Sequence, residues 1–160
     1  MNCFEAIQKE IIDLGFEIIS KDLERPWGCF LVINESQAQD FANKFFDGLN
    51  IDSLKVSGKL SPKILIVNPN SKLSWQYHHR RAEIWRVYKG KVGVSKSIDN
   101  NEKPMLILGE NEQIKINRGE RHRLIGLDDY GIVSEIWQHT DPNNPSDEND
   151  IVRISDEYGR

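Results

Sequence analysis

The feature that most constrains the fold is a series of short apolar or alternating segments between residues 63 and 137. They are KILIV (63–67), LSWQYH (73–78), EIWRVYKG (83–90), KVGVSKSI (91–98), PMLIL (104–108), EQIKINRG (112–119), HRLIG (122–126) and GIVSEIW (131–137). Asn, Asp, Gly and Pro separate them. Closely spaced short strands without long helices between them predict an antiparallel sandwich or barrel, not a doubly wound α/β fold.

Two short helices are expected before these strands. Apolar residues at helical spacing predict a helix over residues 2–14, which ends at Gly15. Residues 36–49 predict a second helix, because a Ser-x-x-Gln capping box precedes apolar residues that share one face. Between them, the apolar run over residues 29–33 predicts a strand.

The length favours one domain over residues 1–160. We expect the helices and the first strand or strands within residues 1–60, the barrel core within residues 61–140, and an acidic loop and tail over residues 141–160. A single domain of this size is long enough to bury a hydrophobic core.

Composition restricts the partners and the compartment. A net charge of −4 argues against a nucleic-acid binder, which normally carries a basic face. Two cysteines without Cys-x-x-Cys spacing predict no disulfide framework and a reducing, cytoplasmic location. The chain shows no long apolar run and no signal-peptide pattern, so we expect no contact with a membrane.

The segment QYHHRRAEIW (76–85) carries most of the chemistry. On a strand, alternate side chains share a face, so Gln76, His78 and Arg80 would point one way. Glu83 would open the next strand, and His122 follows a later turn. Two imidazoles, a carboxylate and an amide suit a divalent ion, which predicts a metal site of Gln76, His78, Glu83 and His122. The alternative is a hydrogen-bonded polar cluster without metal.

The spacing resembles the cupin pattern, in which Gly-x5-His-x-His-x3–4-Glu-x6-Gly is followed by Gly-x5-Pro-x-Gly-x2-His. Glu83 is followed by Gly90 at the proper interval. The second motif corresponds to residues 109–122, slightly expanded and with Asn117 in place of Pro. The resemblance implies an all-β cupin fold, a double-stranded β-helix or jelly-roll barrel.

A closer resemblance is to the cupin domain of type II phosphomannose isomerases, including the C-terminal part of bifunctional mannose-1-phosphate guanylyltransferases. The matching stretches are RPWG (25–28), LSWQYHHRRAEIW (73–85), RGERHRL (118–124) and DIVRISDEYGR (150–160). The resemblance implies a metal-dependent sugar-phosphate isomerase that converts mannose 6-phosphate to fructose 6-phosphate through an enediol. We expect no guanylyl transfer, because the sequence has no room for a nucleotidyltransferase domain.

One position departs from the family. Its members usually carry His where Arg80 stands, and a guanidinium is not a metal ligand. Gln76 would compensate, because a Gln-x-His pair followed by Glu and His resembles the ligand set of type I phosphomannose isomerases. The site would then hold one divalent ion, zinc first, with iron, manganese, cobalt or nickel as alternatives. Alternatively, the site is metal-free and Arg80 pairs with Glu83.

Isomerisation needs a base, an electrophile and a phosphate anchor. We predict Glu135 as the base, with His79 and Asp156 as alternatives, and place Arg153 with the catalytic residues.

For the sugar phosphate we predict Arg25, Arg80 and Arg160, because arginine offers paired donors in a fixed fork. Arg153 and Arg160 lie in the tail, which would fold over the mouth of the barrel.

Other functions stay open at this point. One is a non-catalytic cupin that binds a sugar or a nucleotide sugar, and another is an isomerase for a different aldose phosphate, such as a heptose phosphate. A third is a cupin of the epimerase or oxygenase kind. We also expect a homodimer, because cupins commonly pair and strand edges are exposed.

Overall fold

The computed structural model describes residues 1–55 and 58–160. Its elements are α1 (Cys3–Asp13), β1 (Ile18–Arg25), β2 (Gly28–Ile33), the 3₁₀ helix η1 (Glu35–Gln37), α2 (Ala38–Phe45), β3 (Lys63–Val67), β4 (Trp75–Tyr77), β5 (Arg81–Lys89), β6 (Val92–Ser97), β7 (Leu106–Leu108), β8 (Gln113–Ile116), β9 (Arg121–Gly126), β10 (Gly131–His139) and β11 (Val152–Ser155).

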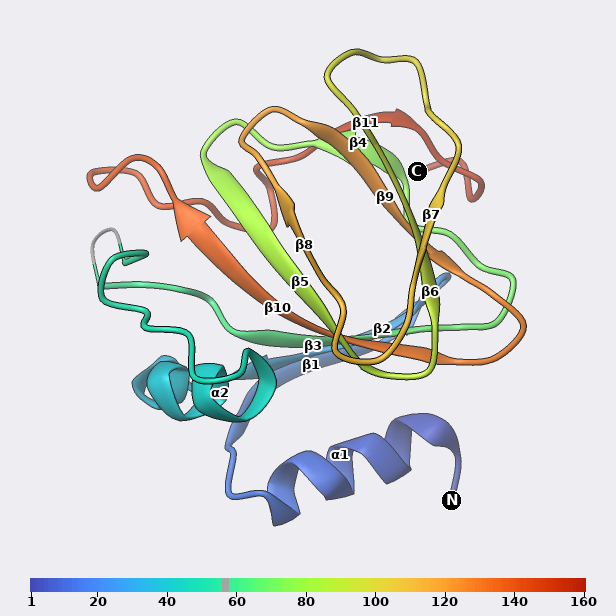
Figure 1. The fold of residues 1–160 in the computed structure, drawn as a ribbon. Coiled ribbons are helices and arrows are strands. Elements are labelled where there is room, and N and C mark those ends of the chain that lie inside the picture. Colours follow the sequence, from blue (N-terminus) through green and yellow to red (C-terminus); the bar gives the residue numbers. More distant parts are fainter. Residues whose placement is uncertain (56–57) are drawn as a thin grey trace.

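The strands form two antiparallel sheets that face each other (Figure 1). One sheet has the order β1-β2-β3-β10-β5-β8, and the other has the order β11-β4-β9-β6-β7. Strands far apart in sequence pair as neighbours, such as β3 with β10 in the first sheet and β4 with β11 in the second. The predicted all-β, cupin-type fold is confirmed.

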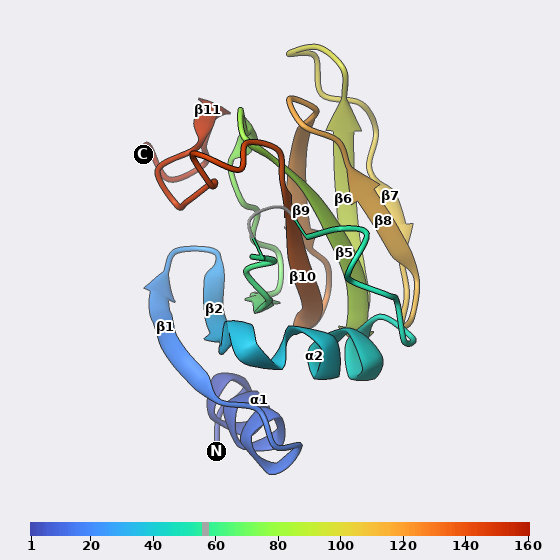
Figure 2. The same cartoon turned by 90° about the vertical axis from the view of Figure 1, so that its left-hand side faces the viewer.

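The middle strands of the larger sheet, β3 and β10, are buried on both faces. Ile64 and Ile66 of β3 belong to a core shared with the helices, which lie against the outer face of this sheet (Figure 2). Leu65 and Val67 point the other way, into a second core between the sheets. Successive side chains of a strand alternate between faces, so one run of apolar residues serves both cores.

The helices differ from prediction in their details. The side chain of Asn2 accepts a hydrogen bond from the backbone N–H of Glu5 and caps α1. The predicted capping box at Ser36 is wrong: the side chain of Asn34 accepts from the backbone N–H of Ser36 instead, and α2 begins only at Ala38. A 3₁₀ turn intervenes because the Asn34 side chain captures this backbone group first.

Two strands had no counterpart in the sequence analysis. β1 has no regular alternation of buried and exposed residues, and β11 lies in the polar tail. β1 forms a hairpin with β2, which follows it directly in the chain, whereas β11 pairs with β4, which is distant in sequence. None of the helices in the described ranges has the length and apolar composition that crossing a membrane requires.

Candidate metal centre and adjoining cavity

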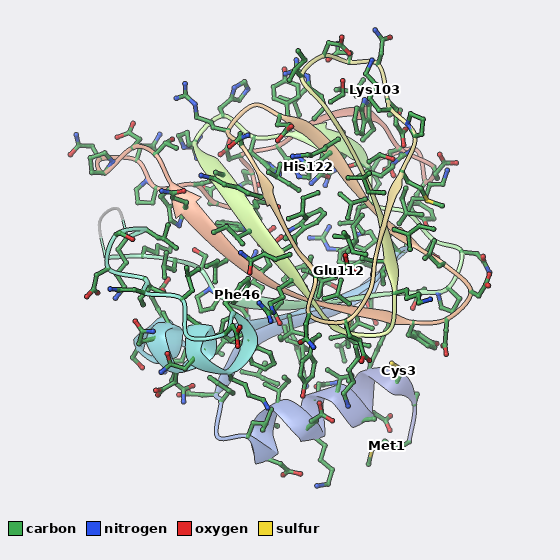
Figure 3. The ribbon with its side chains drawn as sticks, viewed as in Figure 1. Met1, Cys3, Phe46, Lys103, Glu112 and His122 are labelled. Carbon is green, nitrogen blue, oxygen red and sulfur yellow. The ribbon has the colours of Figure 1, made fainter. Side chains whose placement is uncertain are left out.

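Three buried side chains converge between the sheets: His78, Glu83 and His122. His78 follows β4, Glu83 lies on β5, and His122 lies on β9, where Figure 3 labels it inside the barrel. One potential ligand atom from each residue lies within 4.8 Å of the other two. The structure therefore brings together three of the four residues predicted as metal ligands in a ligand-like arrangement.

Backbone carbonyls orient both imidazoles. The Nδ1–H of His78 donates to the carbonyl oxygen of Asp150 at 2.7 Å, and that of His122 donates to the carbonyl oxygen of Glu120 at 2.9 Å. A carbonyl only accepts, so these contacts place the proton on Nδ1 and leave the Nε2 lone pair toward the centre. Burial lowers the pKa of His122 to about 4, so its ring is neutral at pH 7.

Glu83 supplies the negative charge of the cluster. Its Oε1 lies 3.0 Å from Nε2 of His78, and its Oε2 lies 3.7 Å from Nε2 of His122. Burial raises the pKa of the Glu83 carboxyl, but its interactions with His78 and with the Arg81 guanidinium outweigh burial and hold that pKa well below its ordinary value. Glu83 is therefore an ionised carboxylate in the interior.

The contacts around Nε2 of His78 fit a divalent cation. Besides Glu83, the atoms near it are Nε2 of His122 at 3.2 Å, Nη2 of Arg81 at 3.2 Å and Nε2 of Gln76 at 3.4 Å. No single protonation state of Nε2 of His78 suits all of these neighbours. An unprotonated Nε2 repels the Glu83 carboxylate and the lone pair of His122, whereas a protonated Nε2 repels the N–H donors of Arg81 and Gln76. A cation between the imidazoles and the carboxylate would convert repelling lone pairs into ligands.

Gln76 lies beside the cluster, opposite His122 across β4 and β9. Its amide oxygen accepts from Ser74 Oγ at 2.5 Å, and its amide nitrogen faces His78. An amide nitrogen is a donor and not a ligand. In this orientation Gln76 borders the centre without presenting the oxygen that metal binding requires.

The orientation predicted for Arg80 is wrong. The chain leaves the strand after Tyr77, and the Asp150 carboxylate accepts the backbone N–H groups of His79 and Arg80 at 2.9 Å each. The Arg80 guanidinium faces Asp147 and Asp150 at 3.8 and 3.9 Å, and it does not line the cavity beside the centre. Residues 78–80 form a turn, so the alternation assumed for one continuous strand does not apply.

Arg81 makes the contact with Glu83 that was predicted for Arg80. It is the first residue of β5 and is 5% exposed. Its Nε donates to Oε1 of Glu83 at 2.9 Å, and its guanidinium lies 3.6 Å from the ring centre of Trp137. The one-residue change follows from where the turn ends and β5 begins.

A cavity rich in cations adjoins the centre. Its basic side chains are Arg25, Lys63, Arg81, Arg153 and Arg160, and its acidic ones are Glu83, Glu135 and Glu148. In a chain with a net charge of −4, this local excess of positive charge favours an anionic ligand.

The arginines at the mouth of the cavity are only partly neutralised. Arg25 pairs with Asp22 at 3.0 Å, and Arg160 pairs with Asp156 at 2.7 Å. Arg153 forms no ion pair with any residue that the structure describes. Burial and the charge of Arg160 lower the pKa of the Arg153 guanidinium, which indicates crowded cations.

Glu135 lies on the cavity wall between two indoles. Trp85 Nε1 donates to its Oε2 at 2.6 Å, and Trp137 Nε1 donates to its Oε1 at 2.8 Å. Burial, followed by the charge of Glu83, raises the pKa of Glu135 to about 7. Of the predicted alternatives, His79 packs edge-on against Tyr77, whereas Asp156 is paired with Arg160.

A two-sheet barrel with an inward His-Glu-His group defines this protein as a cupin. The family described as "Mannose-6-phosphate isomerase C-terminal" matches residues 47–156, and the chain belongs to that family. The resemblance inferred from the motifs is thereby confirmed.

Curated relatives extend far beyond this chain. A mannose-1-phosphate guanylyltransferase of Escherichia coli (strain K12) is 30% identical over 142 residues, which are 89% of this chain and 24% of the relative. The alginate biosynthesis protein AlgA of Pseudomonas putida is 35% identical over 139 residues, which are 87% of this chain and 23% of the relative. The chain thus spans about a quarter of the length of these relatives.

Among solved structures, a crystal structure of CapF with the inhibitor 3-isopropenyl-tropolone superposes with a TM-score of 0.56. The match has 16% sequence identity and covers 87% of this chain and 34% of that chain. At this identity the likeness concerns the fold alone.

The relatives correct the function expected from the sequence. They are named for guanylyl transfer and for xanthan or alginate biosynthesis, and none of those cited carries an isomerase name. The prediction of a mannose-6-phosphate isomerase is therefore wrong, and its variant for another aldose phosphate falls with it. The named transferases are enzymes. The role of Glu135 as a catalytic base was predicted for the isomerase reaction and is withdrawn with it.

Proposed function

We propose that this protein is a metal-binding cupin that binds a mannose phosphate, as part of the enzymatic handling of that substrate class. One observation carries the proposal: Glu83 of the His-Glu-His group lines the cavity that an incompletely neutralised arginine cluster also borders. The family description and the guanylyltransferase names differ in the reaction, but both contain a mannose phosphate.

The arginine end of the cavity suits the phosphate. The Arg153 guanidinium forms no ion pair with any described residue, and Arg25 and Arg160 border the same space. A phosphate accepts paired N–H donors from arginine and relieves the repulsion between crowded cations. Arg80, which was also predicted for this role, does not border the cavity and is left out.

The metal end suits the sugar. His78, Glu83 and His122 would hold the ion, which would supply a Lewis-acid position for a sugar oxygen. Two imidazoles and a carboxylate are a common zinc set, so zinc is proposed first, with iron, manganese, cobalt or nickel as alternatives. Trp27 and Trp85 form apolar parts of the cavity wall. The homodimer and the cytoplasmic location stay predictions.

Calorimetric titration tests this proposal. Zinc-loaded protein is titrated with mannose 1-phosphate, mannose 6-phosphate and mannose. We expect either phosphate to bind and mannose to bind far more weakly. Arg153→Gln should weaken phosphate-ester binding by roughly 10- to 100-fold, the usual size of a lost charge-assisted hydrogen bond.

Arg118→Gln is the matched control, because Arg118 is exposed and does not border this cavity. It should leave the affinity within about twofold of wild type. Equal binding of mannose and its phosphates, or equal effects of the two substitutions, would contradict the proposed phosphate site.

A further inference from the structure

Arg81 lies where the metal centre meets the cavity, and its guanidinium contacts both. Nε donates to Oε1 of Glu83 at 2.9 Å, and Nη2 donates to Nε2 of His78 at 3.2 Å. The same side chain also borders the cavity. One cation therefore contacts two of the three residues that would hold the metal.

The other side of the guanidinium is held by the loop before β11. Nη1 donates to Oγ of Ser146 at 2.9 Å and to the carbonyl oxygen of Asp147 at 3.0 Å. The plane lies over the ring of Trp137 at 3.6 Å. The guanidinium is a rigid plane, so Nη2 can leave His78 only if the whole group pivots. A pivot about Nη1 within this plane would keep the contacts with Ser146, Asp147 and Trp137 and would move Nε away from Glu83.

His78 cannot serve Arg81 and a metal ion at once. Its Nδ1–H is committed to the carbonyl oxygen of Asp150, so the ring has one lone pair, on Nε2. That lone pair accepts either the N–H of Arg81 or a metal ion. A guanidinium and a divalent cation would also repel each other at the Glu83 carboxylate.

We infer that Arg81 is a tethered cation that neutralises Glu83 in the metal-free protein, and that metal binding turns its Nη2 into the cavity as a donor to the bound phosphate ester. This inference rests on the metal centre of the proposed function. The metal and the anionic ligand then promote each other's binding, because each favours the same position of Arg81. Arg81 is thus a ligand-binding residue whose availability depends on the metal.

The first arm of the test measures zinc affinity by chelator competition in wild-type protein, Arg81→Met and Arg80→Met. Met fills a similar length without a charge or a strong ligand atom. Arg81→Met should bind zinc roughly 10-fold more tightly or better, because a competing charge has gone. Arg80→Met removes the neighbouring charge, which contacts neither His78 nor Glu83, and should change the affinity less than about threefold.

The second arm measures the affinity for mannose 1-phosphate with and without zinc. In wild type, zinc should strengthen binding more than it does in Arg81→Met, whereas Arg80→Met should behave as wild type. Any direct contact between metal and sugar is common to all three proteins. The larger zinc-dependent gain in affinity in wild type than in Arg81→Met therefore reports the release of Arg81.

Nitrogen-15 NMR of the guanidinium groups in wild-type protein covers the case in which Arg81→Met does not fold. Zinc should shift the Arg81 signals, and subsequent mannose 1-phosphate should shift them again. Unshifted Arg81 signals in zinc-saturated protein, or zinc affinity that is unchanged or weakened in folded Arg81→Met, would overturn the inference alone. Failure of wild type to bind zinc would instead overturn the metal centre of the proposed function.

Discussion

Among single residues, Glu135 shows how the barrel interior changes the chemistry of a side chain. Two indole N–H groups occupy its two oxygens, yet burial and the Glu83 carboxylate raise its pKa to about 7. An unfolded glutamate ionises near pH 4.3. The folded protein therefore keeps this proton over a pH range in which the unfolded chain has lost it.

This difference predicts a pH dependence of stability. The protonated Glu135 side chain contributes fully to the free energy of unfolding below about pH 4.3. This contribution is lost as the pH rises through about 7, which lowers the free energy of unfolding by on the order of 3 kcal/mol. Urea unfolding at pH 5 and pH 8 should show a smaller loss of stability in Glu135→Gln than in wild type. Glu24→Gln, at an exposed position, should lose as much stability between pH 5 and pH 8 as wild type. An equal loss in all three proteins would contradict the raised pKa of Glu135.

At the scale of elements, the β1–β2 hairpin brings Arg25 and Trp27 to the cavity. Gly28 makes this possible because β2 passes very close to β3. A Cβ atom on Gly28 would lie 1.9 Å from the carbonyl oxygen of Ile66, and the residue has a φ of +151°. No side chain fits this approach without moving one strand away from the other.

Gly28→Ala should therefore destabilise the protein by roughly 3 kcal/mol or more, through backbone strain and the separation of β2 from β3. Chemical denaturation measures the loss. Gly109→Ala is the matched control, because its Cβ would meet only the Glu112 side chain, at 3.4 Å, and should cost less than about 1 kcal/mol. Similar losses for both variants would show that the close approach of the strands does not limit stability.

At the scale of the whole molecule, the centre joins distant parts of the chain. His78 follows β4 of one sheet, Glu83 lies on β5 of the other, and Asp150 fixes His78 from the loop before β11. A ligand that binds only the assembled site stabilises the entire fold by mass action.

Thermal unfolding should consequently depend on zinc. At a free concentration 100-fold above the dissociation constant, zinc should add about 2.7 kcal/mol to the free energy of unfolding, and a chelator should remove it. His78→Ala should lose this response because it lacks one ligand. A wild-type melting temperature that does not respond to zinc, or an equal response in His78→Ala, would contradict the metal centre.

The sequence by itself determined the strand pattern and the chemical types at the centre. A short continuous apolar run such as residues 63–67 predicts a strand that is buried on both faces, so this strand can be predicted without a structure. The same is true of His78, Glu83 and His122, whose ligand types and motif spacing predicted a cluster that the structure brings together.

The tertiary structure decided which arginine meets that cluster and which residues surround it. A turn at residues 78–80, closed by the Asp150 carboxylate, places Arg81 inside and Arg80 outside. The pairing of β11 with β4 places Arg153 at the cavity mouth. The alternation of side chains is a local property of the chain, but the length of a turn and the partner of a strand depend on distant hydrogen bonds. A shift of one residue reverses the direction, inward or outward, of every later side chain in a strand. Only the folded chain therefore determines which side chains face the centre.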